Sequence, residues 1–228
     1  MVVAPPVRHI TWRTATRIIA SRFPPVQLYE RVSADPATWE ALIAAEALVS
    51  PRVRDEVGEI HVVPVADRVS GPGATWVMAP FTYHNPKGSR FSDGSYGVYY
   101  AAGDVPTAVA ETAYHFARFA ADSGDGIRYE DMRVLVGRID ADFHDLEGVP
   151  EDPDSYAASQ AFAAALRTNP TNGIHYPSVR RPDGRCVAAF RPKAVGVPKQ
   201  TRHLKYYWDG SAVRRYFDYE TEAWIEIA

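Results

Sequence analysis

The sequence predicts an α+β protein, because its β-rich runs outnumber its helical segments and the two kinds do not alternate regularly. Its 228 residues are enough for one domain with a sizeable core. Apolar residues make up 46% of the chain and charged residues 23%, a balance typical of folded globular proteins and not of disordered ones. We therefore expect a single folded domain.

The first third of the chain is expected to contain one helix and two strands. Residues 12–19 fit either a short strand or a helical turn, and periodicity does not decide between them. A helix is predicted over 36–48, where Asp35 can cap the first turn and apolar side chains share one face. Two runs on either side of a Ser-Gly-Pro-Gly turn predict strands, at 60–65 and 75–79.

The middle of the chain gives the clearest local signals. An aromatic run predicts a strand over 96–102, and the helix predicted over 105–121 begins with Asp104 as its cap. Three strands are expected after it, at 132–139, 173–176 and 185–190. A helix is expected over 154–167, with Asp152 as its cap. The chain is expected to end in a hairpin of 204–208 and 212–219 around a type I′ turn at Asp209-Gly210.

Charge and cysteine content restrict the kind of partner and compartment. The net charge of −3 gives no general attraction to nucleic acid, so direct nucleic-acid binding is not expected, although Arg180, Arg181 and Arg185 cluster. The one cysteine, Cys186, sits in an apolar run and is interpreted as a buried thiol in a reducing compartment. With no run of about 18 apolar residues and no secretion signal, we expect a cytoplasmic protein without a membrane segment.

The helix predicted over 105–121 carries the first candidate site residues. Glu111 and His115 are four positions apart and therefore share a face, with Arg118 below them. This spacing also fits a solvent-exposed stripe. The face made by Val109 and Phe116 can anchor the helix in the core.

The other candidates lie on loops and strands. Arg90 is flanked by glycines and serines that allow close approach of a ligand, and its guanidinium can donate two hydrogen bonds to a phosphate. Tyr99 and Tyr100 point to opposite faces of their strand, so one of them can line a site. Ser178 follows a proline turn without a GxSxG context, which indicates a hydrogen-bonding residue and not a nucleophile. Each of these three features also fits a structural role.

Several common site types are absent from the sequence. It contains no Walker loop, no GxGxxG after a strand, no HExxH and no paired cysteines. The histidines lack metal-ligand spacing, so no metal site is expected.

Five short segments between residues 85 and 192 form an ordered set. They are GSRF at 88–91, GVYYAA at 97–102, TAVAE at 107–111, GIHYPSVR at 173–180 and VAAFRP at 187–192. By this set the chain resembles the RES-domain family of bacterial toxins, named for a shared arginine, glutamate and serine. Many members have GGRW where this chain has GSRF. The resemblance implies one domain over 1–228, with 85–192 as the family core and 1–80 as an N-terminal elaboration.

The resemblance also implies a fold similar to ADP-ribosyltransferases, with twisted antiparallel sheets around a cleft for NAD+. NAD+ would be the substrate, with no prosthetic group. The family's arginine, glutamate and serine match Arg90, Glu111 and Ser178, with Tyr100 as the cleft tyrosine. His115 matches a subgroup of the family that has ETAYH after the strand. The family also has an arginine early in the chain, for which we choose Arg17, with Arg31 as the alternative.

Function and partners follow from the same resemblance. It implies a toxin of a type II toxin–antitoxin system, neutralised by an Xre-like antitoxin. The ADP-ribose acceptor stays open between water, phosphate and a protein such as a phosphoribosyl-pyrophosphate synthetase. A non-catalytic module that binds a nucleotide or a partner protein is the alternative function.

Overall fold

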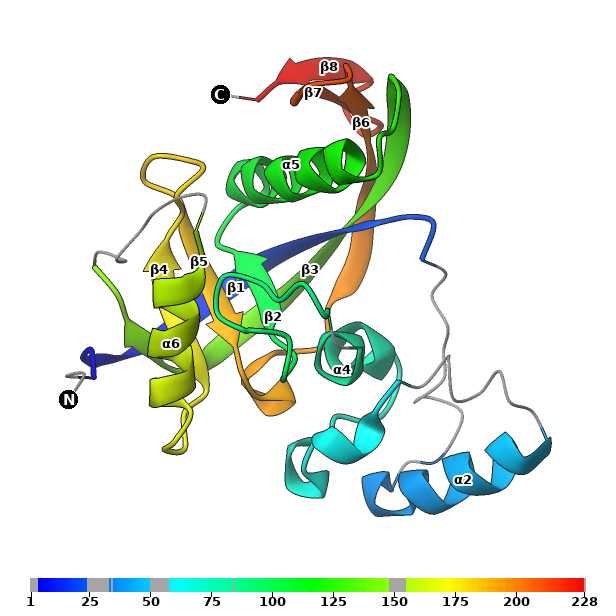
Figure 1. Ribbon diagram of the computed structural model, residues 1–228, viewed down its shortest axis with the longest axis vertical. Coiled ribbons are helices and arrows are strands. Elements are labelled where there is room, and N and C mark those ends of the chain that lie inside the picture. The colour runs from blue at the N-terminus through cyan, green and yellow to red at the C-terminus, as the bar shows by residue number, and fades with distance from the viewer. Residues whose placement is uncertain are drawn as a thin grey trace.

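The structure, a computed structural model, describes residues 4–23, 33, 35–49, 58–83, 85–147 and 155–227. It confirms the α+β class: helices lie against one large twisted sheet (Figure 1). The strands are β1 (Val7–Ala20), β2 (Tyr99–Ala102), β3 (Arg128–Asp145), β4 (Gly173–Pro177), β5 (Arg185–Ala189), β6 (Lys199–Trp208), β7 (Val213–Asp218) and β8 (Ala223–Glu226). The α-helices are α2 (Trp39–Val49), α4 (Ala74–Thr82), α5 (Val105–Asp122) and α6 (Ala157–Leu166).

The sheet contains eight strands in the order β1-β2-β5-β4-β3-β6-β7-β8, and β1 also pairs with β3. Five strands therefore form a closed circuit of pairings, from β1 through β2, β5, β4 and β3 back to β1. One pair, β3 with β4, is parallel, so the sheet is mixed and not purely antiparallel as expected. The long strand β3 joins this circuit to the terminal β6-β7-β8 extension.

Strand β1 settles the alternative left open at residues 12–19. It is a long strand that pairs with β3 from Val7 to Ala20. The register shifts between Trp12 and Ala15, which is a β-bulge, and a bulge changes which face the following side chains occupy. Ile10 and Ala15 lie in one core cluster, whereas Ile18 and Ala20 lie in the other.

Two strands expected near the N-terminus are wrong. The segment 75–79 belongs to helix α4, and 60–65 forms two short 3-10 turns, Ile60–Val62 and Val65–Asp67, separated by Pro64. In α4 the buried side chains follow helical spacing, which a five-residue window is too short to distinguish from strand alternation. They are Ala74, Val77, Met78, Phe81 and Thr82.

The remaining elements follow the sequence closely. The helix expected over 36–48 is a 3-10 turn followed by α2, and the Asp35 carboxylate accepts from the backbone N–H of Ala37. Helix α5 begins at the Asp104 cap, whose carboxylate accepts from Thr107 at 2.7 Å. Helix α6 is confirmed, but its expected cap Asp152 lies outside the described residues. The terminal hairpin is confirmed with a four-residue connection between Trp208 and Val213 in place of the expected two-residue turn.

The core lies on both faces of the sheet. One cluster packs α5 and α6 against one face, with Val109, Ala113 and Phe116 of α5 buried as expected. The second cluster packs α2 and α4 against the other face. Among the described residues, no helix is long and apolar enough to cross a membrane.

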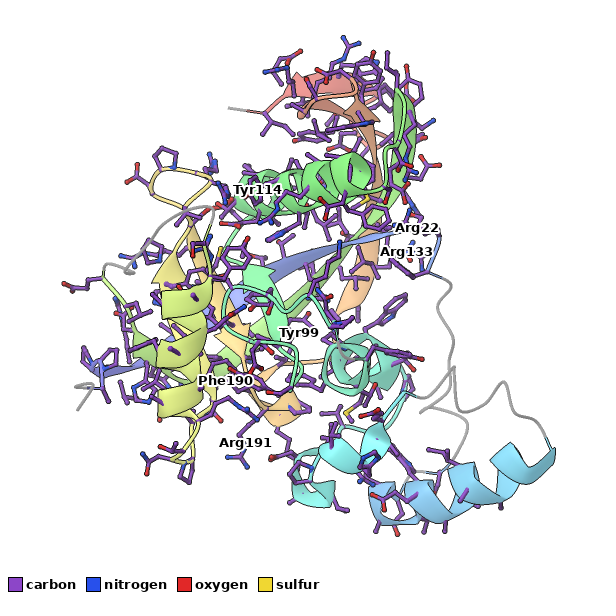
Figure 2. The ribbon with its side chains drawn as sticks, viewed as in Figure 1. Arg22, Tyr99, Tyr114, Arg133, Phe190 and Arg191 are labelled. Carbon is purple, nitrogen blue, oxygen red and sulfur yellow. The ribbon has the colours of Figure 1, made fainter. Side chains whose placement is uncertain are left out.

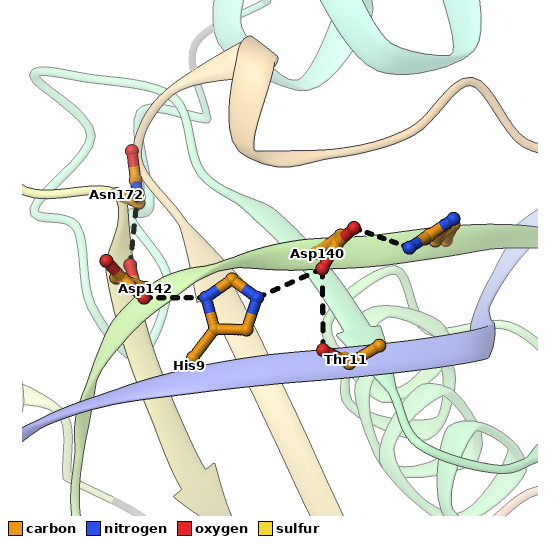
Figure 3. A network of polar contacts seen from close by, with 6 residues as sticks. His9, Thr11, Asp140, Asp142 and Asn172 are labelled. Atoms are coloured by element: carbon orange, nitrogen blue, oxygen red, sulfur yellow. Dashed lines mark hydrogen bonds and ion pairs between the residues drawn. The ribbon is translucent and has the colours of Figure 1, made fainter.

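A surface network joins β1 to β3 (Figure 3). The His9 ring lies between two carboxylates, with Nδ1 2.7 Å from Asp142 Oδ1 and Nε2 3.0 Å from Asp140 Oδ1. The hydrogen bond to Asp142 and then the one to Asp140 raise the pKa of His9 above its ordinary 6.5. The charged ring can donate to both carboxylates at once, which the neutral ring cannot.

We expect His9→Gln to lower the melting temperature at acidic pH and to have less effect at alkaline pH. The folded-state pKa of His9 is raised, so its stabilisation is complete below the unfolded-state pKa and is lost as pH rises through the folded-state value. Melting temperatures of both proteins from about pH 5 to about pH 9 measure this difference. A constant difference across that range would contradict the assignment.

Candidate functional site

The carboxylate of Glu111 is held by a serine from a distant part of the chain. Ser178 Oγ donates to Glu111 Oε1 at 2.6 Å, and it accepts from the backbone N–H groups of Arg180 and Arg181, both at 3.1 Å. Two donors into the hydroxyl oxygen fix its direction and polarise its proton toward the carboxylate. The structure thus brings Glu111 and Ser178 together, with Ser178 positioning the carboxylate.

Arg90 is a buried cation with an unsatisfied donor. Its side chain is 5% exposed, and its Nη1 atom is buried without a hydrogen-bond partner. Such a group costs free energy unless a ligand or ordered water completes it. The Arg90 guanidinium lies over the ring of Tyr156, which Arg118 of α5 also contacts, so Arg90 faces the α5 side of the sheet, as Glu111 does.

The loop around Arg90 is fixed by its neighbours. Ser89 and Ser92 form a short antiparallel bridge, and Gln160 of α6 donates from Nε2 to both of their carbonyls. Gly88 has φ +69°, and a Cβ there would lie 2.6 Å from the Ser92 carbonyl oxygen, so this turn requires glycine. Arg90 is therefore presented on a rigid turn.

Tyr100 supports that turn from strand β2. Its hydroxyl is 2.8 Å from Ser89 Oγ and accepts from the Phe91 backbone N–H at 3.0 Å. Burial raises the pKa of Tyr100, so the phenol is neutral. As predicted, Tyr99 and Tyr100 pack on opposite faces of the sheet, and Tyr100 faces the α5 side. The role of Tyr100 shown by these contacts is to hold the Arg90 loop.

His115 lies within electrostatic range of three arginines. Desolvation by the surrounding side chains, and then the charges of Arg180, Arg90 and Arg118, lower the pKa of His115 to about 4. The His115 side chain keeps solvent contact, but the side chains packed around the ring and the three nearby cations keep the imidazole neutral at pH 7. A ring with so low a pKa is a weak base at neutral pH, so it suits hydrogen bonding better than proton abstraction.

Two tyrosine rings connect those three arginines. Arg90 lies 4.9 Å from the centroid of Tyr156, and Arg118 lies 5.9 Å from both Tyr156 and Tyr114. Arg180 stacks 3.3 Å from the centroid of Tyr114, which projects from α5 beside the β4–β5 loop (Figure 2). We call these five residues the arginine–tyrosine cluster. The two electron-rich ring faces hold the three cations in place, and guanidinium groups are the donors that suit an anionic ligand.

Arg17 does not join this cluster. It stacks 4.8 Å from the centroid of Tyr99 and donates from Nη1 to the Tyr100 carbonyl at 3.0 Å. Tyr99 belongs to the core cluster on the α4 side, so the Arg17 side chain occupies the face opposite to Glu111. Its competitor Arg31 lies outside the described residues. Arg17 therefore faces away from Glu111, and its predicted place in the NAD+ site stays a prediction.

An open cavity of about 580 Å³ lies elsewhere, at the end of β1 and along β6, and is lined by residues that include Ser21, Asp131 and His203. None of the predicted site residues lines it.

Among the described residues, no group of three His, Cys, Asp or Glu side chains is arranged to hold a metal ion. Cys186 is buried, as the sequence predicted. Burial raises the pKa of its thiol well above the ordinary value, so the reactive thiolate is disfavoured.

The fold and the site define an α+β protein in which a cluster of arginines and tyrosines lies near a carboxylate held by a serine. The RES domain profile matches residues 65–209, so the chain belongs to the RES domain family. The match begins after Arg17 and Arg31 and includes Arg90, Tyr100, Glu111 and Ser178.

Two individual proteins resemble this chain along most of its length. The uncharacterized protein y4oC of Sinorhizobium fredii is 31% identical over 199 residues, which cover 86% of this chain and 84% of y4oC. The solved M. tuberculosis MbcT–MbcA toxin–antitoxin complex contains a chain similar to this one with a TM-score of 0.44 and 11% identity. That similarity covers 90% of this chain and 87% of the other.

Proposed function

We propose that this protein is the toxin of a toxin–antitoxin system and that it cleaves the nicotinamide–ribose bond of NAD+. The observation that carries the proposal is the buried, unsatisfied guanidinium of Arg90 on the same side of the sheet as the carboxylate held by Ser178. Membership of the RES domain family supports it. An antitoxin partner is part of the same proposal.

Within this proposal each residue takes a role that is consistent with its contacts. Cleavage passes through a positively charged, oxocarbenium-like sugar. The Glu111 carboxylate either stabilises this positive charge or polarises the acceptor that attacks the sugar. Ser178 keeps Glu111 in one orientation. Arg90 binds a phosphate oxygen of the pyrophosphate, and Tyr100 holds the loop that presents it. Neutral His115 hydrogen-bonds a substrate hydroxyl.

The test is incubation of the purified protein with NAD+, with and without inorganic phosphate or cell extract, followed by product analysis. Nicotinamide with free ADP-ribose identifies water as the acceptor, ADP-ribose-1″-phosphate identifies phosphate, and labelled protein identifies a side chain. A phosphoribosyl-pyrophosphate synthetase is the protein acceptor to examine first. NAD+ that binds without being consumed would reject the enzyme and leave a non-catalytic nucleotide-binding module.

A further inference from the structure

We propose that the cavity at the end of β1 is a second ligand site, which binds the oxyanion, phosphate or carboxylate, of a small molecule. Its donors are Ser21 and His203 in the cavity wall and Arg133 next to them. Arg133 packs near Trp76 of α4, and α4 covers the face of the sheet opposite to α5. The site is therefore separate from Glu111, and the inference does not depend on the proposed function.

Arg133 is a buried cation without a counter-ion. It is 7% exposed, and it forms none of the ion pairs found in the described part of the chain. Its Nη2 donates to the Ser21 carbonyl at 2.9 Å, at the end of β1 (Figure 2). Its Nε and Nη1 atoms are buried without a hydrogen-bond partner. A buried charge with unsatisfied donors costs free energy, and an anion would recover part of that cost.

Strand pairing places Arg133 beside the cavity. It stands directly opposite His203 in the register of β3 and β6, and it follows Asp131 by two positions on β3. Both of these neighbours line the cavity, and their side chains project from the same face of the sheet as that of Arg133. One hydrogen bond, to Ser21, restrains the guanidinium. An oxyanion in the cavity can draw it across, because an oxyanion accepts more than one hydrogen bond from a guanidinium.

Two side chains of the wall have donors left for the same anion. Ser21 Oγ is buried without a partner. The Gln200 side-chain nitrogen lies 2.9 Å from His203 Nε2. An amide nitrogen only donates, so Nε2 accepts and the neutral ring carries its proton on Nδ1. Donors from the end of β1, from β3 and from β6 thus surround one place.

The charges at the other side of the cavity orient the ligand. In the sheet β1 pairs with β3, β3 with β6 and β6 with β7, so Ser21 and Glu220 lie on opposite sides of the cavity. Glu220 lies 3.0 Å from Arg202, which also pairs with Asp218, so two carboxylates share one cation there. The oxyanion therefore belongs at Ser21, and hydroxyl or ammonium groups of the ligand face Glu220. A volume of about 580 Å³ has room for such a molecule.

The first experiment measures thermal protection in the Arg90→Met variant, which lacks the buried guanidinium of the other site. We expect inorganic phosphate or acetate to raise its melting temperature by about 3 °C more than chloride does at the same ionic strength. The anion that protects more identifies the ligand group as phosphate or carboxylate. Adding Arg133→Met should remove most of this protection. Adding Arg138→Met, which removes an exposed guanidinium from the same strand, should retain it.

Two results of this experiment would overturn the second site. They are protection no greater than that by chloride, and equal protection after Arg133→Met and after Arg138→Met. If the protein with both Arg90→Met and Arg133→Met does not fold, Ser21→Ala takes the place of Arg133→Met, because it removes one donor of the wall and little volume.

The second experiment locates the anion by the imidazole NMR signals of two histidines. His203 lines the cavity, whereas His9 pairs with β3 near Asp142, at the other end of that strand. We expect the His203 signals to shift and saturate as the protecting anion is added, and the His9 signals to match those in chloride. Shifts in neither histidine, or equal shifts in both, would reject the location. NAD+ consumption enters neither experiment, so a failure here leaves the proposed function untouched.

Discussion

Glu111→Gln is expected to lower NAD+ turnover by about 100-fold or more. The amide keeps the shape of the side chain and can still accept from Ser178, whose Oγ lies 2.6 Å from the carboxylate. It removes the negative charge that stabilises the oxocarbenium-like sugar. Because that charge develops only in the transition state, the loss should fall on kcat and leave KM for NAD+ nearly unchanged. Nicotinamide release under saturating NAD+ measures it.

The matched control for this variant is Glu226→Gln, whose exposed side chain lies on β8, on a different element from Glu111. It removes the same charge from the protein and should retain wild-type turnover. If Glu111→Gln consumes NAD+ at the rate of the Glu226 variant, the assigned role of Glu111 is wrong. A companion variant, Ser178→Ala, should show a smaller loss than Glu111→Gln, because it releases the carboxylate without removing it.

Local signals in the sequence were sufficient for the elements that carry Glu111. Asp104 caps α5, and the apolar spacing of that helix sets which face packs on the sheet, so the opposite face had to carry Glu111 and His115. The α4 segment was misinterpreted because five apolar residues fit a strand as well as a helix. Strand β8 was not predicted, since its four residues give too short a pattern.

The composition of the site depended on contacts that no local pattern contains. Tyr114, Tyr156 and Arg180 come from three separate segments, and only the packed structure brings their side chains together. Arg180 had one available signal, its position two residues after Ser178. The position of Arg17 depends on a further feature of the packed structure. The bulge between Trp12 and Ala15 shifts the alternation of β1 by one, which moves Arg17 to the α4 face.

Arg90→Met is expected to reduce activity and to leave stability unchanged or improved. Arg90 is 5% exposed with its Nη1 unsatisfied, so the folded protein bears a desolvation cost of about 1–3 kcal/mol that a ligand would relieve. Methionine fills a similar volume and packs against the Tyr156 ring without a donor. The free energy of unfolding should therefore stay constant or rise by about 1 kcal/mol, while kcat/KM for NAD+ falls by about 100-fold.

Arg133→Met separates the effect on binding from the effect of burial. Arg133 is 7% exposed, with Nε and Nη1 unsatisfied, but it packs near Trp76 of α4 and donates to the Ser21 carbonyl, away from Glu111. Both variants remove a buried, partly unsatisfied guanidinium, and only Arg90→Met removes one from the α5 side of the sheet, where Glu111 lies. Denaturant unfolding and nicotinamide release should show similar stability for the two variants and lost turnover for Arg90→Met alone. A large loss of stability in Arg90→Met with retained NAD+ turnover would mean that Arg90 is a structural residue, since a guanidinium that serves the ligand must cost activity when it is removed.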